Sequence, residues 1–331
     1  MINIFLKKLL PSKIIKLIKQ FKMNINMILQ YYYDYKIYTK YNGAKLKMNI
    51  NQIEGKIIAH YHVLEKGMCH PYPKKCFSLP IVKNLIQLIN AYDTKSSIRS
   101  KQVNVAVSVL KKYINFPTNQ KCLTSSLIGK ISLLNTNIKM KPSSLKFSKN
   151  EYFKFCDIPF KEFVLSRYTV RDFLDQDVEI EVLKKAIETA QKTPSVCNRQ
   201  TFKAHILTQK KDIINHLKFQ TGNRGFGEKI NKLIIITSDL NLFEGPKERN
   251  QAFIDGGMFA MSLLYSLHNL KLGAVSLNWS YDKNQNDSLY DLGLIPKNER
   301  VILFIGVGHV PETFKVAVSE KRELVDVLNI I

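Results

Sequence analysis

Two arginines four residues apart, Arg167 and Arg171, flank Thr169 in a short polar segment. Guanidinium groups at this spacing can bind one phosphate in a bidentate manner, and the threonine hydroxyl can add a hydrogen bond. Arginines at this spacing also occur on ordinary solvated surfaces, where they contribute little to stability. The segment by itself therefore indicates a candidate anion site and no more.

A second polar segment, Thr193–Gln200, follows a predicted helix and precedes a predicted strand. The amide groups of Asn198 and Gln200 can donate and accept in one plane, as recognition of a flavin or pyrimidine edge requires. A turn stabilised by serine and asparagine is the alternative. Two shorter polar segments follow, Ser276–Trp279 at the end of a predicted strand and Ser319–Arg322 near the C-terminus.

The order and spacing of these segments are more specific than any one of them. Over about residues 155–328 the chain resembles the FMN-dependent nitroreductase family, through the R-x-[ST]-x-R segment and the P-S-x-x-N-x-Q turn about 25 residues later. Further similarities are Asp255-Gly256-Gly257 in a helix, Leu272-Gly273 where a strand begins, and Gly306-Val307-Gly308 where a strand ends.

The resemblance implies three groups of FMN contacts. The phosphate would be held by Arg167, Arg171 and either Lys321 or Arg322, with Tyr168 and Thr169 beside the ribityl chain. The flavin ring would lie along Pro194, Ser195 and Asn198, with polar contacts from Asn198 and Gln200. The other side of the ring, near N5, would face Ser276, Leu277, Asn278 and Trp279.

Three positions depart from the family's pattern. Thr201 stands where a proline commonly follows the turn glutamine, and Asn278-Trp279 stands where a carboxylate followed by glycine is frequent. Trp279 is the only tryptophan, and it could narrow the pocket, cap the flavin or belong to the core. The adjacent Lys321 and Arg322 lack the usual spacer, which leaves open which of them reaches the phosphate.

Two other candidate sites are weaker. Cys197 has no histidine near it in the sequence, so a small packed residue is favoured over a nucleophile. Five residues form a His/Cys cluster without the spacing of a zinc site, and we expect no metal there: His60, His62, Cys69, His70 and Cys76.

The segment His62–Gly67 is similar to the H-x-[LI]-E-K-G element of an N-terminal extension that some nitroreductase-like proteins carry. Glu65 within it is one of only four acidic residues among residues 1–150. We expect Glu65 to form an internal ion pair.

Hydrophobic patterning predicts the elements that must position these residues. It predicts a helix over about 178–192, a buried helix over 250–270, and strands near 203–208, 233–237, 274–279 and 301–307. Two amphipathic helices are predicted within residues 80–115. The fold class expected is α+β, with a nitroreductase-like mixed sheet flanked by helices and preceded by a mainly helical, basic N-terminal unit.

Charge divides the chain into two unlike halves. Residues 1–150 hold 26 basic and four acidic residues, a net charge of +22, whereas residues 151–331 hold 24 and 23. Residues 115–150 are rich in serine, threonine, asparagine and lysine and lack a sustained period. We therefore expect a basic helical unit over 1–114, a linker over 115–150 and the FMN-binding domain over 151–331.

The cysteines and the N-terminus bear on the cellular setting. Five cysteines without regular spacing predict no disulfide framework, and no apolar run is long enough for a spanning helix or fits a signal peptide. The first 24 residues alternate Ile, Leu and Phe with Lys, which predicts a short basic amphipathic helix that either contacts an anionic membrane or packs on its own domain. A cytoplasmic protein is expected, with peripheral contact at the inner membrane face as an alternative.

The sequence thus predicts an FMN flavoprotein that takes hydride from NADH or NADPH and reduces a small-molecule acceptor of nitro, quinone or enone type in a ping-pong cycle. The resemblance also implies a homodimer with FMN at the subunit interface, and no residue is singled out as a catalytic acid or base. One rival is a flavin enzyme of another reaction type. The other is a basic protein that binds an anionic partner and carries a vestigial flavin domain; nucleic acid is not favoured, because base-reading motifs are lacking.

Overall fold

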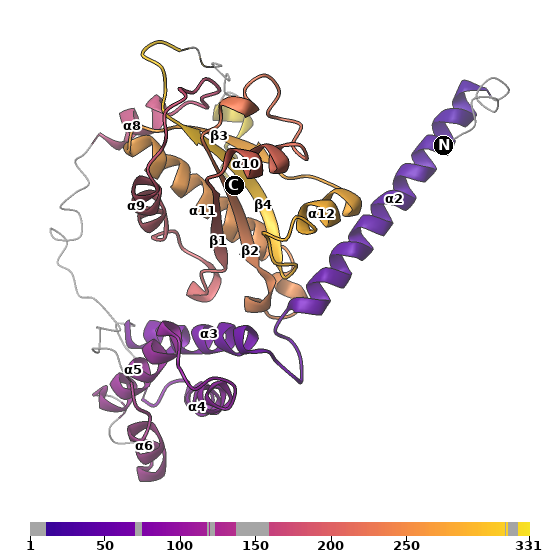
Figure 1. Ribbon diagram of the computed structural model, residues 1–331. Helices are drawn as coiled ribbons and strands as arrows, with labels where there is room; N and C mark the ends of the chain where they lie inside the picture. The colour runs from indigo at the N-terminus through magenta and orange to yellow at the C-terminus, as the bar shows by residue number, and fades with distance from the viewer. Residues whose placement is uncertain are drawn as a thin grey trace.

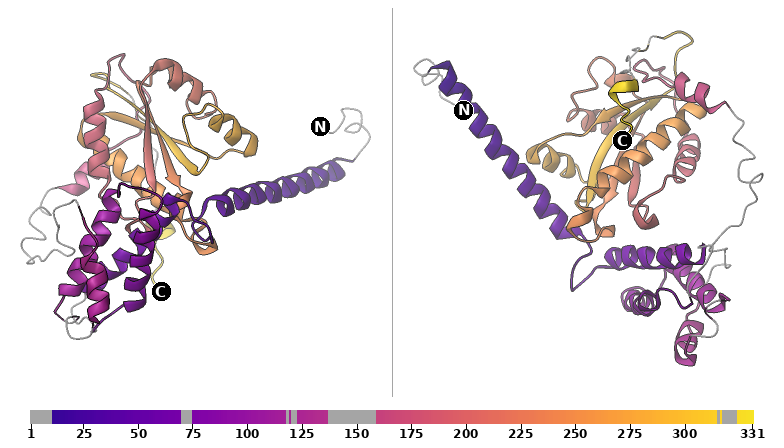
Figure 2. Two further views of the ribbon diagram at one scale, coloured as in Figure 1. Left: turned by 60° about the horizontal axis from the view of Figure 1, so that its bottom comes forward. Right: turned by 180° about the vertical axis from the view of Figure 1, so that it is seen from behind.

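The structure of the protein is a computed structural model, shown in Figures 1 and 2. It describes residues 11–69, 75–117, 119, 123–136, 159–314, 316 and 324–331. The description below is limited to these residues.

Four strands form one sheet in the order β1-β2-β4-β3. They are β1 (Phe202–Leu207), β2 (Lys232–Asp239), β3 (Gly273–Asn278) and β4 (Glu299–Gly308). The α+β class is confirmed, but each of the three pairings is antiparallel, where the sequence predicted a mixed sheet. The reason is that β4 inserts between β2 and β3, so that these two strands, which run in the same direction, are not neighbours.

Apolar side chains cover both faces of the sheet. On one face, α9 (Ile180–Ala190) and α11 (Gln251–Asn269) pack on Ile234, Ile236 and Ile305. On the other, α10 (Lys210–Leu217) and α12 (Lys283–Tyr290) contribute to a cluster around Ile235 and Phe304. All eight residues of β2 are buried. Both predicted helices of this region and all four predicted strands are therefore present, within a few residues of the expected bounds.

Short elements connect this framework. They are α8 (Phe160–Ser166) and the 3-10 helices η1 (Val196–Asn198), η2 (Gly227–Lys229), η3 (Leu240–Leu242), η4 (Pro246–Glu248) and η5 (Leu324–Asp326). Gly256 of α11 lies against Ile302 of β4, where a Cβ atom would be 2.6 Å from the isoleucine side chain. Only glycine allows this close approach of helix and sheet.

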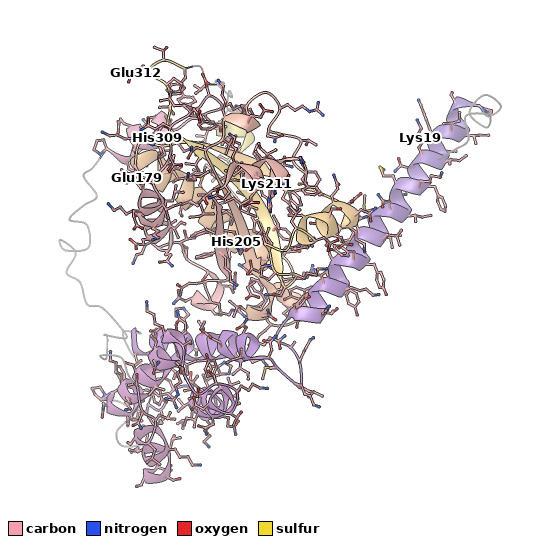
Figure 3. All side chains as sticks on the ribbon, viewed as in Figure 1. Lys19, Glu179, His205, Lys211, His309 and Glu312 are labelled. Atoms are coloured by element: carbon pink, nitrogen blue, oxygen red, sulfur yellow. The ribbon has the colours of Figure 1, made fainter. Side chains whose placement is uncertain are left out.

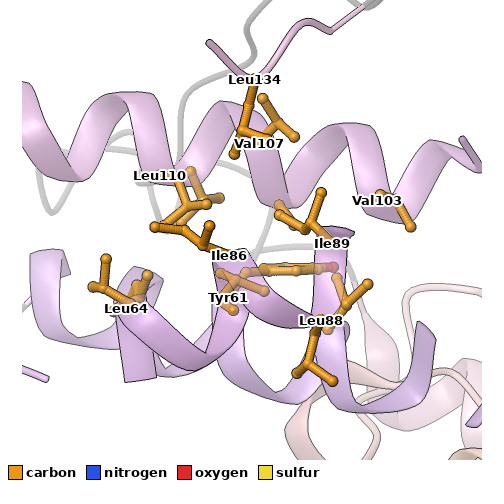
Figure 4. Packing of buried hydrophobic residues seen from close by; sticks show 14 of the residues in the cluster. Tyr61, Leu64, Ile86, Leu88, Ile89, Val103, Val107, Leu110 and Leu134 are labelled. Carbon is orange, nitrogen blue, oxygen red and sulfur yellow. The ribbon is translucent and has the colours of Figure 1, made fainter. Parts of the chain in front are cut away.

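Four helices form a separate cluster below the sheet in the view of Figure 1: α3 (Ile50–Cys69), α4 (Leu79–Asp93), α5 (Lys101–Asn115) and α6 (Ser125–Ser132). Their apolar faces share one core, in which Tyr61, Leu64, Ile89 and Leu110 are buried (Figure 4). The two helices predicted within residues 80–115 are α4 and α5. Part of the segment predicted as a linker forms α6, which adds Leu127 and Ile131 to this core.

Cys76 is disulfide-bonded. The sequence predicted no disulfide framework, and a single bonded cysteine is not a framework. It does show that the cysteines of the chain are not all free thiols. Cys197 is the free cysteine among the described residues.

The longest helix is α2 (Ser12–Tyr41), which extends away from the rest of the protein (Figures 1 and 2). The sequence predicted a short helix within the first 24 residues; residues 1–10 lie outside the described residues, Pro11 is the N-cap residue, and the helix that follows continues to Tyr41. Proline is well tolerated at this end because the first helical amides need no intrahelical partner. The C-terminal part of α2 contacts the sheet region through an Asp34–Arg300 ion pair and a 2.7 Å hydrogen bond from Tyr38 Oη to Gly245 O.

Helix α3 docks the helical cluster on η3 through a close backbone contact. A Cβ atom at Gly55 would lie 2.9 Å from Leu242 Cα. Just before α3, the Gly43 amide donates to Phe243 O at 2.7 Å, and Asn49 Nδ2 donates to Asn241 Oδ1 at 3.0 Å. The glycine and these hydrogen bonds fix α3 against the loop that follows β2.

This contact predicts a specific loss of stability in Gly55→Ala. The added methyl group would meet backbone that cannot rotate away, so we expect the variant to be destabilised by about 1–3 kcal/mol in urea unfolding. The matched control is Gly129→Ala in α6, which has no heavy atom within 4 Å of the new Cβ. Helix propensity should stabilise that variant by about 0.5–1 kcal/mol. Equal stability of the two variants would contradict the docking contact.

Candidate functional site

A cavity of about 440 Å³ lies where α8 ends, beside the last turns of α11 and the start of β3. Arg167 and Tyr168 line it together with two residues that the sequence did not single out, His268 and Lys271. The segment is anchored to the sheet by a 3.1 Å hydrogen bond from the Val170 amide to Ala274 O. One side of this cavity is therefore rich in positive charge and hydrogen-bond donors.

The surroundings of His268 favour the neutral imidazole. Burial and the positive charge of Arg167 lower the pKa of the imidazole from its usual value. Its Nε2 lies 2.7 Å from Ser166 Oγ, which fixes the ring at the cavity wall. Arg167 and Lys271 thus provide the permanent positive charge, and a bound phosphate would suit them. Arg171 is exposed and does not line the cavity, and Thr169 is half-buried.

The Thr193–Gln200 turn is held on α11 at two places. The Val196 amide donates to the carboxylate of buried Asp255 at 3.1 Å, and Thr193 Oγ1 donates to Ser262 Oγ at 2.7 Å. Within the turn, the Gln200 amide donates to Ser195 Oγ at 2.9 Å. Pro194 is exposed, and Ser195 and Asn198 are half-buried.

Three residues of this turn have left-handed backbone. Their φ angles are 50° at Cys197, 54° at Asn198 and 50° at Gln200. Asparagine tolerates this region, whereas cysteine and glutamine adopt it rarely. Such conformations persist only where the surroundings impose them, and they concentrate at ligand sites. The backbone is therefore consistent with a turn shaped for contact with a ligand.

Arg199 supplies the constraint that holds the turn. It is 2% exposed, forms an ion pair with Glu248 and donates from Nη1 to Leu242 O at 2.9 Å. Leu242 is also the residue on which Gly55 of α3 packs. The arginine in this motif is thus a structural residue that ties the turn to the docking site of the helical cluster.

The Arg167 segment and the Thr193–Gln200 turn contact different parts of α11. The turn reaches Asp255, whereas Ser166, next to Arg167, contacts His268. Thirteen residues of helix, about 20 Å along the axis, separate Asp255 from His268, whereas Ser262, which Thr193 contacts at the start of the turn, is only about 9 Å from His268 along the axis. None of residues 194–200 lines the Arg167 cavity. One chain therefore does not bring the two predicted groups of contacts into that cavity.

The predicted N5-facing segment alternates between solvent and core. Ser276 and Asn278 are exposed, whereas Leu277 and Trp279 are buried. Trp279 donates from its indole N–H to Asn286 Oδ1 at 2.8 Å and stacks on Phe304 with 5.0 Å between ring centroids. Trp279 is a core residue, the third of the roles that the sequence left open, and Leu277 is also buried. Lys321 and Arg322 lie outside the described residues.

Gln200 lines a second crevice, of about 510 Å³, between the helical cluster and the edge strand β1. Lys203 and His205 project into it from the same face of β1 (His205 is labelled in Figure 3). Both bind the buried carboxylate of Glu299 at 2.6 Å. Burial alone would raise the pKa of Glu299, but hydrogen bonds from His205, Lys203 and Thr237 outweigh it and lower the pKa to about 2.

The His/Cys cluster of the sequence is explained by ordinary contacts. His62 Nδ1 lies 3.2 Å from Glu65 Oε2, which confirms an internal ion pair for Glu65. His60 contacts Asn84 Nδ2 at 3.1 Å and Lys56 O at 2.7 Å. No group of three or more metal-binding side chains occurs in the described parts of the chain. His70 and the side chain of Cys69 lie outside them.

Comparison with known proteins agrees with the signatures at the start of this region. The family model described as Nitroreductase family matches residues 164–234, which include the Arg167 segment, the Thr193–Gln200 turn, β1 and the start of β2. The match to the nitroreductase family is thus confined to residues 164–234. No curated protein matches the chain.

Solved structures similar to the chain cover about half of it. A nitroreductase family protein from Streptococcus pneumoniae is 20% identical, with a TM-score of 0.44, and the match covers 52% of this chain and 99% of that one. An FMN-dependent nitroreductase from Clostridium difficile is 24% identical over 47% and 91% of the two chains, with a TM-score of 0.40. A provisionally named nitroreductase from Desulfovibrio desulfuricans, solved in complex with FMN, is 20% identical over 52% and 96%, with a TM-score of 0.44.

The Glu299 cluster predicts a pH-dependent contribution to stability. Because the pKa of Glu299 in the folded protein is below its ordinary value, its contribution is complete above about pH 5 and is lost as the pH falls towards 2. Glu299→Gln should therefore destabilise the protein by about 2–4 kcal/mol at pH 7, and by clearly less at pH 3, in urea unfolding.

Glu181→Gln is the matched control, because Glu181 pairs with Lys184 at 2.6 Å on the exposed surface of α9. Its removal should change the unfolding free energy by less than about 0.5 kcal/mol. A loss of unfolding free energy in Glu299→Gln that is as large at pH 3 as at pH 7 would contradict the ion cluster around Glu299.

Proposed function

We propose that the protein is an FMN-dependent oxidoreductase that transfers hydride from NADH or NADPH to a small-molecule acceptor of nitro, quinone or enone type. The observation that carries this proposal is the cationic cavity at Arg167, because Arg167 itself belongs to the segment matched by the nitroreductase family. FMN supplies the redox chemistry when bound, and the protein binds and orients it. The proposal includes a cytoplasmic protein and the predicted division into a helical unit, a linker and an FMN-binding domain over 151–331, with the helical unit extended from residue 114 to take in α6 and the linker correspondingly shorter than 115–150.

The residues present suit the two ends of FMN in different ways. Arg167 and Lys271 at the cavity would hold the phosphate, and neutral His268 could donate or accept one hydrogen bond there. Asn198 and Gln200, presented by the constrained turn, would make polar contacts to the ring edge. Ser276 and Asn278 are the two side chains of the β3 end that are exposed and able to contact a ligand. No side chain is assigned as a catalytic acid or base.

The lining of the Arg167 cavity supports a homodimer. A single flavin needs both the phosphate contacts and the ring contacts, and in one chain none of residues 194–200 lines the Arg167 cavity. A second copy of the chain could bring its own turn beside the first copy's clamp. FMN would then lie between subunits, as the family resemblance implies.

The affinity for FMN tests the proposed role of Arg167 in binding the phosphate. Arg167→Ala should weaken FMN binding to the full-length apoprotein about 10–100-fold, because a charge-assisted contact to phosphate is lost. Arg171→Ala should weaken it less, because Arg171 is exposed and does not line the cavity. The measurement is a titration of FMN fluorescence.

The control is Arg224→Ala, an exposed arginine away from this cavity, which should bind FMN within about twofold of the wild type. Riboflavin, which lacks the phosphate, should bind wild type and Arg167→Ala about equally. An Arg167→Ala variant that keeps full FMN affinity would contradict this assignment of the phosphate site.

A further inference from the structure

The helix α2 carries an apolar stripe that its own chain leaves uncovered. Its members recur alternately every four and three residues along the helix: Ile14, Ile18, Phe21, Ile25, Ile28, Tyr32 and Tyr35. Except for the half-buried Ile18, each is between 42% and 68% exposed. This spacing places all seven on one side of the helix. Residues 12–29 form no hydrogen bond or ion pair with any other element that the structure describes.

From Ile14 to Tyr32 the stripe faces away from the rest of the protein, whereas Tyr35 lines a cavity between α2 and the sheet region. The contacts of α2 with the sheet region come from Gln30, Tyr33, Asp34 and Tyr38. At 100° per residue these four lie on the side of the helix opposite Ile25, Ile28 and Tyr32. The helix is therefore fixed at its C-terminal end with the stripe turned outwards, and its N-terminal part stands clear of the body (Figures 1 and 2).

The charge on α2 is almost entirely positive. Lysines occupy positions 13, 16, 19, 22, 36 and 40, and Asp34 is the only acidic residue of the helix. Asp34 is already paired with Arg300. The first four lysines flank the stripe or lie opposite it, as in helices that rest on anionic bilayers. Lys19 is labelled near the far end of α2 in Figure 3.

Two features favour a lipid surface over a second α2 helix as the partner. Leu17 and Leu29, 62% and 56% exposed, widen the stripe to about a third of the helix circumference, more than a two-helix seam needs. A second α2 would also bring the same lysines without a carboxylate to pair them, whereas anionic headgroups complement them. None of the described helices is long and apolar enough to cross a membrane, so α2 would lie in the interface.

We propose that the outward stripe of α2, together with its flanking lysines, docks the protein on an anionic lipid surface. The inference is independent of the flavin site. Bound in this way, α2 would bury Phe21, Ile25 and Ile28 below the headgroups, and the constrained C-terminal end of the helix would hold the sheet domain at the bilayer surface.

The test is flotation of the full-length protein with two kinds of vesicle. One kind is phosphatidylcholine alone, and the other is equal parts of phosphatidylcholine and phosphatidylglycerol. Wild type should float with the anionic vesicles, and the bound fraction should fall as salt is added. Ile25→Ser with Ile28→Ser should lower the partition coefficient about tenfold or more, because two buried isoleucine contacts are removed.

The matched control is Met23→Ser with Met27→Ser, which removes two apolar residues of the same helix that are each 51% exposed but lie off the stripe. It should keep binding within about twofold of the wild type. Both variants change exposed positions, and circular dichroism checks that the helix is retained. Equal flotation with neutral vesicles, or equal losses in the two variants, would overturn the proposal. So would a wild type that self-associates through the stripe without lipid and does not bind vesicles.

Discussion

Strand β2 is buried along its whole length, and the arrangement of the C-terminal half follows from covering it. A strand with eight consecutive buried residues must have apolar partners on both faces and a strand on each side. Strands β1 and β4 pair with its two edges, α9 and α11 cover one face, and the cluster around Phe304 covers the other. Because α11 joins β2 to a strand beyond β4, it crosses the sheet, and both candidate contact segments become anchored on it.

The candidate site depends on polar contacts with this buried helix and with the loop after β2. Asp255 fixes the start of the Thr193–Gln200 turn, and Arg199 fixes its end through Glu248 and Leu242. Helix α3 then packs on Leu242 through Gly55. The N-terminal helical cluster is therefore a direct neighbour of the turn that we propose contacts the flavin ring. A shift of α3 against Leu242 would therefore be transmitted to that turn through Arg199, which donates a hydrogen bond to Leu242 O.

The sequence predicted the elements well where the hydrophobic pattern was long or uniform, as in α11, α9 and β2. No individual helix was predicted over α3. Its histidines and cysteine were interpreted as candidate metal ligands, although the spacing of Ile53, Ile57, Tyr61 and Leu64 is typical of a helix. The helix α2 continues to Tyr41, well beyond the first 24 residues for which a short helix was predicted. The antiparallel order of the sheet depends on long-range pairing, which local pattern does not encode.

Local sequence pattern was limited in the same way at the candidate flavin site. The motifs identified Arg167 and the turn, and the cavity and the left-handed backbone agree with a role in binding. Lys271 and His268 had no motif, because they reach the cavity only through the packing of α11 against β3. Trp279 and Arg199 belong to segments that the sequence analysis singled out, yet their side chains are buried and stabilise the fold. Sequence spacing finds segments, whereas burial decides which side chains in them can meet a ligand.

The most direct test of the central claim is the visible absorption of the purified full-length protein, loaded with FMN and followed without oxygen as NADH or NADPH is added. The account predicts a protein-bound flavin spectrum that one of the two nucleotides bleaches and that a quinone or nitroaromatic acceptor restores. A protein that binds no FMN would contradict the assignment of the cofactor. A bound flavin that neither nucleotide reduces would contradict the assignment of the reaction.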